Sequence, residues 1–356
     1  MAEDRINRRQ MLAAAFVLLL SPVARRFPSS LVMSAGTASY LAAPLAALPV
    51  LLMILFMARI LRGGRGLGDV FELSLGRTLG RLCIFIISIW LIFYCGFILR
   101  SAAYRFASTA YPSAAPWLFI IVSALVCLPL AAGSFSAVAR MSVLIRPLLL
   151  TVLGAIFIFS LSDCSFTGLF ALREADTLPV IKSSFAVMNT LSVVCYLGFG
   201  ENRCGDGFET KRYFAWALVL LAITELLCLC CLGVFGPELT MKLNYPFFML
   251  VRDISIFNSF ARMEALAITL WMFADAVHFS LLLHLASANL RRCFNMERGI
   301  LTTVCCLLAA GAGLAMPGDM LGVGLFSEKI VPFGNALIIF GLLPLTALVG
   351  WIRRKI

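Results

Sequence analysis

FARMEALAITLWMFADAVHFSLLLHLASANLRR, from Phe260 to Arg292, reads as one transmembrane helix that nevertheless carries two carboxylates and two imidazoles. At about 100° per residue, one face of this helix holds a row of polar and aromatic side chains: Glu264, Trp271, Asp275 and His278. Charged groups are costly in hydrocarbon, so this face should be turned toward a bundle interior or a watery cavity. Two interpretations follow: an interhelical hydrogen-bond seam without a ligand, or the lining of a central pathway in a transporter-like protein.

The composition supports a polytopic helical membrane protein. The chain of 356 residues is 62% hydrophobic and 13% charged, whereas a soluble globular domain is about half apolar and about a quarter charged. The net charge of +11 does not indicate nucleic-acid binding, because the basic residues are scattered among short loops and do not gather on one polar face. Their placement indicates membrane topology instead.

Metal, redox and catalytic chemistry have weak support in the sequence. Most of the 12 cysteines sit inside apolar runs, where cysteine behaves as a small hydrophobic residue. Cys228 and Cys231 have CxxC spacing but no second ligand pair or nearby histidine. His278 and His284 lie six residues apart on different helix faces, and no nucleophile–base pair is recognisable. We therefore expect neither an enzyme nor a metal or cofactor site.

A spanning helix needs about 20 apolar residues. On that rule the sequence predicts ten spans, at about 10–29, 38–61, 79–107, 115–133, 139–162, 181–208, 212–236, 260–290, 299–316 and 330–352. The first has the basic start of a signal peptide, but it continues through Arg25 and Arg26 and is interpreted as the first membrane helix. With a cytoplasmic N-terminus, most of the 29 Lys and Arg residues fall on the inside, which predicts that both termini are cytoplasmic. Arg25 and Arg26 fit this topology poorly, because it places them near the outer end of the first helix.

Two spans have sequences typical of interrupted helices. The first contains Ser21-Pro22, and a proline inside a helix removes a backbone hydrogen bond. The sixth contains Tyr196, with Gly198 and Gly200 on either side of Phe199. Interruptions five helices apart predict two inverted five-helix repeats, about 10–162 and 181–352, with a ligand site between them at mid-membrane. The whole chain, 1–356, is then one transmembrane domain.

Other polar positions within the apolar spans complete the prediction. Asn189 precedes the sixth-helix interruption and Glu201 follows it, while Arg100 in the third span is either a buried cation or a side chain that reaches the outer interface. Two longer loops stand out. Residues 62–78 predict a short surface helix, and residues 236–259 predict a folded outer segment that is either a lid or an ordinary ordered loop.

Several segments, taken together, resemble the spore germination permeases. They are INRRQMLAAAF near the start, FILRSAAYRF, AVARMSVLIRP, YLGFGE, and the run from Tyr245 through Asp275. The last is the most specific, because Arg262, Glu264 and Trp271 match the family's R-x-E and W positions. These permeases are the B subunits of spore germinant receptors, within the amino acid/polyamine/organocation transporter superfamily, and the resemblance covers essentially the whole chain.

The resemblance implies a ten-helix fold of two inverted repeats with helices 1 and 6 unwound. It implies a small germinant, most often an amino acid, and as partners a receptor A subunit and a lipoprotein C subunit. The location implied is the inner membrane of a bacterial endospore. In the superfamily, an aromatic–glycine–aromatic motif marks the sixth-helix break, here Tyr196, Gly198 and Phe199. The glycine expected in helix 1 is replaced by Ser21-Pro22, and a proline has no N–H with which to bind a carboxylate.

The leading hypothesis is a germinant-sensing subunit. Its ligand would lie between Ser21-Pro22 and the Tyr196–Phe199 segment, where a helix N-terminus favours a carboxylate. Asp275 would face the ammonium group, or exchange a proton through His278, since an imidazole titrates near neutral pH. The alternatives are a proton-coupled amino acid transporter that acts without receptor partners, and a structural subunit whose polar helix face serves only assembly.

Overall fold

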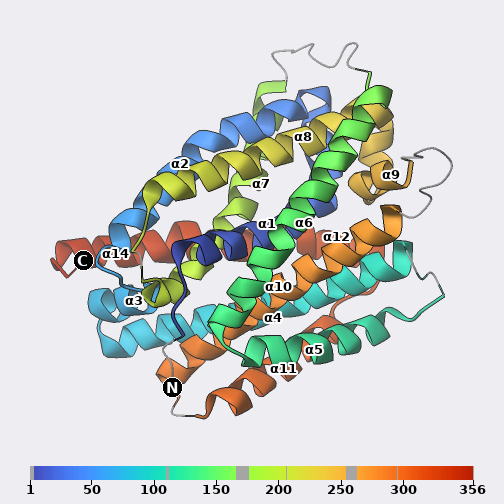
Figure 1. The fold of residues 1–356 in the computed structure, drawn as a ribbon. Helices are drawn as coiled ribbons and strands as arrows, with labels where there is room; N and C mark the ends of the chain where they lie inside the picture. Colours follow the sequence, from blue (N-terminus) through green and yellow to red (C-terminus); the bar gives the residue numbers. More distant parts are fainter. Residues whose placement is uncertain are drawn as a thin grey trace.

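The computed structural model describes residues 4–109, 111, 113–165, 176–205, 207–253, 263–294 and 296–355. Within its helices it leaves a few side chains undescribed, those of Arg25, Arg26, Asp253, Met263, Glu264, Ala265 and Met320. The regular structure of the described residues is helical, apart from a single β-bridge between Ile6 and Cys204. Figure 1 shows the helices as a bundle in which long rods run side by side between two ends.

The first half of the chain contains six α-helices and two short 3-10 helices. They are α1 (Arg8–Ala35), η1 (Gly36–Leu41, a 3-10 helix), α2 (Ala42–Ile60), α3 (Leu67–Leu75), α4 (Arg77–Thr109), α5 (Pro116–Ala132), α6 (Phe135–Ser160) and the short 3-10 helix η2 (Leu161–Asp163). Helix α1 begins with a reciprocal cap, because Asn7 accepts a hydrogen bond from the Gln10 backbone while Gln10 accepts one from the Asn7 backbone.

The second half begins with α7 (Thr177–Ser192), which continues directly as the 3-10 helix η4 (Val193–Arg203). The remaining elements are α8 (Thr210–Lys242), α9 (Pro246–Asp253), α10 (Met263–Cys293), α11 (Arg298–Ala315), and a last rod of α12 (Met320–Leu325), η5 (Phe326–Ile330), α13 (Val331–Ala336), η6 (Leu337–Leu342) and α14 (Leu343–Ile352). Both η5 and η6 are π-helical, a winding that is uncommon and is frequently found at functional sites.

Eight helical stretches in the described residues are long and apolar enough to cross a membrane. They are Phe27–Ile60, Arg77–Thr109, Phe135–Asp163, Thr177–Arg203, Thr210–Lys242, Leu266–Cys293, Arg298–Ala315 and Leu321–Ile352. Helix α5 is apolar but shorter, and α1 contributes only its last part to the first of these stretches. The chain is therefore a helical membrane protein, and the count of ten spans stays a prediction.

Helix α1 lies at the centre of the bundle. It packs against α8, α6, α10 and α7, and its residues from Ala13 to Leu19 are almost fully buried. Helix α4 packs against α10 and α11 on the other side of the core. The α4–α11 approach is close at Gly96, where an added Cβ would lie 2.7 Å from the backbone oxygen of Ala309. Small residues allow such backbone proximity between membrane helices.

The predicted interruption of the first helix is wrong. Helix α1 runs without a break through Ser21 and Pro22, and a second proline, Pro28, also lies inside it. A proline removes one backbone hydrogen bond and fixes a φ that suits a helix, so the surrounding helix persists where packed neighbours support it. In the sixth span the α-helix does end, at Ser192, but the chain keeps turning as the 3-10 helix η4 through the glycine segment.

Both predicted loop segments contain helices. Residues 62–78 form α3 with Leu67 and Phe71 buried, so it is packed into the bundle more deeply than a surface helix. In 236–259, Gly236 has φ +70 and bends α8, and α9 follows. Helix α9 contacts α1, α6, α8 and α10, so the described part of this segment is folded onto the bundle.

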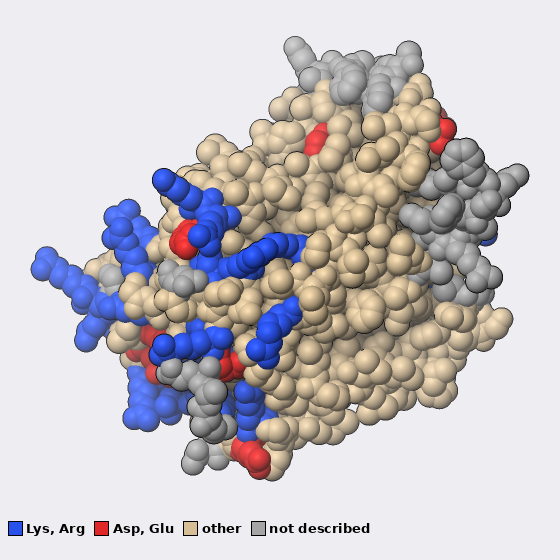
Figure 2. Space-filling model, in the orientation of Figure 1, with Lys and Arg blue, Asp and Glu red and all other residues tan. Residues whose placement is uncertain are grey.

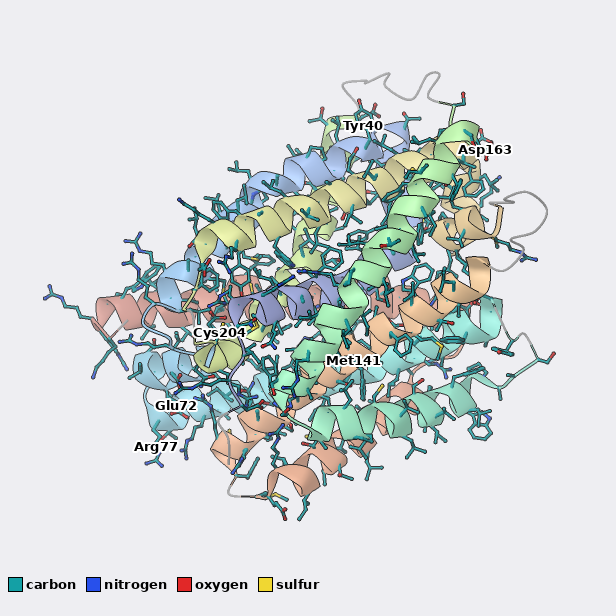
Figure 3. All side chains as sticks on the ribbon, in the orientation of Figure 1. Tyr40, Glu72, Arg77, Met141, Asp163 and Cys204 are labelled. Carbon is teal, nitrogen blue, oxygen red and sulfur yellow. The ribbon has the colours of Figure 1, made fainter. Side chains whose placement is uncertain are left out.

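Charge divides the two ends of the bundle. Figure 2 shows Lys and Arg gathered at one end, and Figure 1 places both chain termini at that same end. In Figure 3, Glu72, Arg77 and Cys204 lie at this end, whereas Tyr40 and Asp163 lie at the opposite end. We call the first the basic end and the second the far end.

Candidate functional site

The carboxylate of Asp275, on α10, is held by two donors from two other helices. Ser21 of α1 donates its hydroxyl to Oδ1, and Arg105 near the end of α4 donates Nη2 to Oδ2. All three side chains are buried. A buried carboxylate is stable only when it is paired and hydrogen-bonded, and this one is both. Three helices that are far apart in the sequence therefore meet at one neutralised charge.

Aromatic rings cover this pair toward the far end. The Arg105 guanidinium lies over the Trp271 ring, 5.3 Å from its centroid. Phe247 of α9 contacts the same indole edge-on, with 5.3 Å between the ring centroids. An arginine over an indole face gains a cation–π interaction, and this gain grows when water is excluded. Helix α9 is therefore connected to the Arg105–Asp275 pair through the Trp271 ring, which Phe247 and Arg105 both contact.

A cavity of about 420 Å³ lies between helices of the same bundle, and neither Arg105 nor Asp275 lines it. It is bounded by α1, α4, α7 and the last rod of the chain, and its lining includes Pro22, Tyr94, Asn189, Glu328 and Asn335. Small-molecule sites usually have volumes of about 300 to 1,000 Å³. The cavity reaches Pro22, and the preceding residue, Ser21, donates to Asp275. Consecutive helix residues point about 100° apart, so α1 presents Pro22 to the cavity and Ser21 to Asp275.

Amide and aromatic groups form the polar part of the cavity wall. The side-chain oxygen of Asn335 accepts hydrogen bonds from the Tyr196 hydroxyl at 3.0 Å and from the Trp90 indole N–H at 2.9 Å. Asn189 donates its Nδ2 to the Pro332 carbonyl at 2.8 Å. These bonds fix the orientation of the Asn335 amide, so any ligand meets a rigid polar group here.

His278 lies fully buried one helical turn beyond Asp275. Its ring contacts Tyr94 edge-on at a centroid distance of 5.6 Å, and Tyr94 lines the cavity. Of the predicted helix face, Trp271, Asp275 and His278 all point into the bundle. The side chain of Glu264, the fourth member, lies outside the described residues.

The remaining predicted residues lie elsewhere. Gly198 lies against α2 and α3, where an added Cβ would be 2.9 Å from side-chain atoms of Met57 and Leu67. Phe199 stacks on Phe71 of α3 with ring centroids 6.2 Å apart. Neither Gly198 nor Phe199 lines the 420 Å³ cavity, although Tyr196 bonds to its wall. The structure thus does not bring Gly198 or Phe199 to Asp275 across the cavity.

Arg100 also lies away from the cavity. Its Nε donates to the carbonyl of Pro317, in the turn between α11 and α12, at 3.1 Å. The side chain is partly exposed, which agrees with the interpretation that it reaches the interface. The side chains of Arg25 and Arg26 lie outside the described residues.

A second buried pair closes the basic end. The Arg8 guanidinium is 2.6 Å from a carboxylate oxygen of Glu201, and both side chains are almost completely buried. Arg8 also donates to the Tyr213 hydroxyl at 3.2 Å and lies over the Phe208 and Tyr213 rings. The pair connects the first turn of α1 to the end of η4, so Glu201 has a partner of its own, remote from the cavity.

Asp4 forms a further contact at this end. Its carboxylate accepts backbone hydrogen bonds from Phe135 at 2.7 Å and Ser136 at 2.9 Å, in the first turn of α6. Burial alone would raise the pKa of the Asp4 carboxyl, but these N–H groups and the nearby Arg203 outweigh it, and its pKa is below the usual value. Arg203 in turn contacts His284 of α10, with 2.6 Å between the two nitrogens.

Three of the residues that build these contacts were not singled out from the sequence. Arg105 stands near the end of an apolar span, which is typical of an interfacial cation, and Arg8 belongs to a basic N-terminus that indicates topology. Asn335 is different, since a lone amide within the apolar run 330–352 is itself a signal of a polar interior. Among the described residues no group of three His, Cys, Asp or Glu side chains is placed to hold a metal ion.

Comparison with known proteins gives a family and a fold. The family model described as "Spore germination protein" matches residues 5–312. No curated protein matches the chain. Among solved structures, MhsT in complex with L-phenylalanine has a TM-score of 0.62 at 16% identity, with 95% of this chain and 89% of that chain covered. A substrate-bound, outward-open Na⁺-coupled sialic acid symporter has a TM-score of 0.60 at 14% identity, with 95% and 79% covered. At such identities the likeness is one of fold.

Proposed function

The chain belongs to the spore germination protein family, and we propose that it is a germinant-sensing, permease-like membrane subunit of a spore germinant receptor. Its ligand is a small amino-acid-type germinant, and its partners are the receptor A subunit and the lipoprotein C subunit. It resides in the inner membrane of the endospore with both termini cytoplasmic, so the basic end faces the cytoplasm. The collection of Lys and Arg at the end that holds both termini supports this orientation.

The proposed architecture is ten membrane spans in two inverted repeats, about 10–162 and 181–352. The fold likeness to two transporter structures supports it, as does the change from α-helix to 3-10 helix at Val193 in the sixth span. Because α1 is continuous, only the second of the two repeats has an altered winding at the corresponding place.

The buried Arg105–Asp275 pair is the observation that carries the ligand proposal, and the 420 Å³ cavity, which shares helix α1 with it, is the space from which a ligand would reach it. A zwitterionic amino acid has an ammonium and a carboxylate, which match Asp275 and Arg105 respectively. When the ligand enters, each side chain exchanges its internal partner for a ligand group, so no unpaired charge is created in the core. Asn335, Asn189 and Glu328 on the cavity wall supply further polar contacts.

Sensing follows from differential affinity. A ligand shifts a conformational equilibrium only as far as it binds one state more tightly than the other. Separation of Arg105 from Asp275 moves α4 relative to α10, and the ligand stabilises the separated state. Ser21 ties Asp275 to α1, so the central helix is included in the change. Partner subunits then respond to this rearrangement.

The test compares two carboxylate-to-amide substitutions in spores. Asp275→Asn should abolish the response to amino acid germinants or shift it by more than tenfold in concentration. Glu225→Gln is the matched control, since Glu225 is a partly buried carboxylate of α8 that does not line the cavity. Immunoblots establish that both variants assemble. An unchanged dose–response for Asp275→Asn would remove this residue from the ligand site.

Transport without receptor partners is the competing outcome. Purified chain in liposomes is assayed for uptake of radiolabelled L-amino acids, and the same amino acids are screened for thermal stabilisation of the protein. Stabilisation without uptake supports the sensor. Uptake driven by an imposed proton gradient supports a proton-coupled transporter.

A further inference from the structure

Helix α2 carries a continuous leucine face toward its surroundings. Leu45, Leu48, Leu52 and Leu55 recur at spacings of three and four residues, which places them along one side of the helix. Their exposed fractions are high: 48%, 69%, 55% and 47% in that order. An exposed apolar face of this length on a membrane protein contacts lipid chains. The next positions in the same series are Arg59 and Arg62.

Two cavities adjoin these arginines at the basic end. One, of about 880 Å³, extends from Leu55 and Phe56 past Arg59 to Gly205 and Phe208. The other, of about 500 Å³, lies between Arg65 and Trp351. Arg59 and Arg62 line both, so their side chains stand between two hollows and not on a flat surface.

These two guanidiniums are available to a ligand. Arg59 and Arg62 are exposed, and neither forms an ion pair with an acidic residue in the described part of the chain. Arg65 differs, because it donates to the carbonyl of Lys355 at 3.2 Å. Trp351 packs edge-on against Phe56 with 6.2 Å between ring centroids, which gives the arginines an aromatic neighbour of the kind common at membrane interfaces.

We propose that this face of α2 binds an anionic phospholipid, with the phosphate between Arg59 and Arg62 and an acyl chain along Leu55, Leu52 and Leu48. Guanidinium groups recognise phosphate oxygens through two parallel hydrogen bonds. Leu48 and Arg59 are about 16 Å apart along the helix at 1.5 Å per residue. This length is about half of a hydrocarbon core that is roughly 30 Å thick, so one lipid of one leaflet reaches both.

The leucine face distinguishes a lipid from a soluble phosphate compound. A free phosphate ester would use the arginines alone, whereas a phospholipid uses the arginines and the apolar face together. The basic end also carries most of the Lys and Arg, and such clusters attract anionic lipid surfaces with about 1 kcal/mol per residue. This site differs from a general basic surface because it has two cavities, which allow a lipid headgroup to lie between the Arg59 and Arg62 side chains.

The experiment measures lipid binding to the purified protein by native mass spectrometry. The full chain in neutral detergent is titrated with phosphatidylglycerol, and with phosphatidylcholine as the uncharged comparison. Arg59→Gln/Arg62→Gln should weaken phosphatidylglycerol binding about 30-fold, since two headgroup contacts are lost. The matched control is Arg77→Gln/Arg140→Gln, which removes the same charge from two exposed arginines that line neither cavity.

The outcomes distinguish a specific lipid site at Arg59 and Arg62 from general charge attraction. Weaker binding confined to the Arg59/Arg62 variant supports the site, whereas equal weakening in both double variants overturns it in favour of general charge attraction. Glycerol phosphate in excess should not displace the lipid; displacement at similar concentrations would overturn the role of the leucine face. If the glutamine variant does not fold, Arg59→Lys/Arg62→Lys replaces it, with an expected loss of a few-fold because lysine lacks the planar fork.

Discussion

Arg8–Glu201 and Arg105–Asp275 are the same chemical pair in two settings, one at the basic end and one in the middle of the bundle. At the basic end, Arg8 is enclosed by Glu201, Tyr213 and Phe208, and the pair connects α1 to η4. In the middle of the bundle, Arg105–Asp275 joins α4 to α10, and Ser21 ties the same carboxylate to α1. A buried charge pair is therefore not by itself a sign of a ligand site. The two pairs join different elements, and we expect the first pair to govern folding and the second to govern ligand response.

The largest expected effect is on the enclosed pair. Glu201→Gln leaves the Arg8 cation buried without its counter-charge, which should lower the free energy of unfolding by about 3 to 5 kcal/mol. The fraction of monodisperse protein in detergent and its thermal unfolding temperature measure this. Arg8→Met/Glu201→Leu removes both charges and should recover most of the loss. If Glu201→Gln unfolds at the wild-type temperature, the proposed structural role of this pair is wrong.

An intermediate effect is expected at the Arg105–Asp275 pair, where the change should affect ligand response and not folding. Arg105→Lys keeps the positive charge beside Asp275 but loses the planar contact with the Trp271 ring. The concentration of amino acid needed for half-maximal thermal stabilisation should rise about tenfold, while the unfolding temperature without amino acid changes little. Arg100→Lys is the control, because Arg100 donates to the Pro317 carbonyl away from the cavity. A tenfold rise in both variants would contradict the division between the two regions.

The smallest expected effect concerns Asp4, at the rim of the enclosed region. Asp4→Asn should lower stability by about 1 kcal/mol at neutral pH, since an amide caps the first turn of α6 less well than a carboxylate beside Arg203. The pKa of Asp4 is lower in the folded chain than its ordinary value of 3.8. The carboxylate therefore stabilises the fold above that value, and its contribution is lost as the pH falls through the lowered pKa.

Thermal unfolding of wild type and Asp4→Asn between neutral pH and about pH 3 measures this dependence. The difference between the two proteins should be constant near neutrality and should shrink below about pH 4, where the wild-type carboxyl takes up a proton. A difference that stays constant down to the acid end of this range would mean that Asp4 does not gain from its ionised form.

Sequence reasoning located the helix that matters but not its partners. The row Trp271, Asp275 and His278 is predictable because helical periodicity and the cost of charge in hydrocarbon act within one segment. Arg105 and Asn335 become functional candidates only when helices remote in the chain are brought together, which no local pattern encodes. The interruption at Ser21-Pro22 is wrong for a related reason. A proline's local effect is predictable, but the packed neighbours that keep α1 helical are not.

The glycine segment of the sixth span shows the same limit. Tyr196, Gly198 and Phe199 are adjacent in sequence, and local reasoning assigns them one site. In the structure Tyr196 bonds to the cavity wall, whereas Gly198 lies against α2 and α3 and Phe199 stacks on α3. One short 3-10 helix thus has contacts with two different environments, because its side chains point in different directions about its axis.

The burial of Arg8 has a consequence for biosynthesis. Its hydrogen-bonding partner Tyr213 lies 205 residues further along the chain. At about 5 to 20 residues per second, the ribosome needs about 10 to 40 s to make that intervening stretch. During this interval the first helix enters the membrane while Arg8 still lacks both of its partners, the Glu201 carboxylate and the Tyr213 hydroxyl. Arg8 must stay hydrated at the lipid surface until the later helices emerge. The central helix of the finished protein is therefore one of the last to reach its buried position.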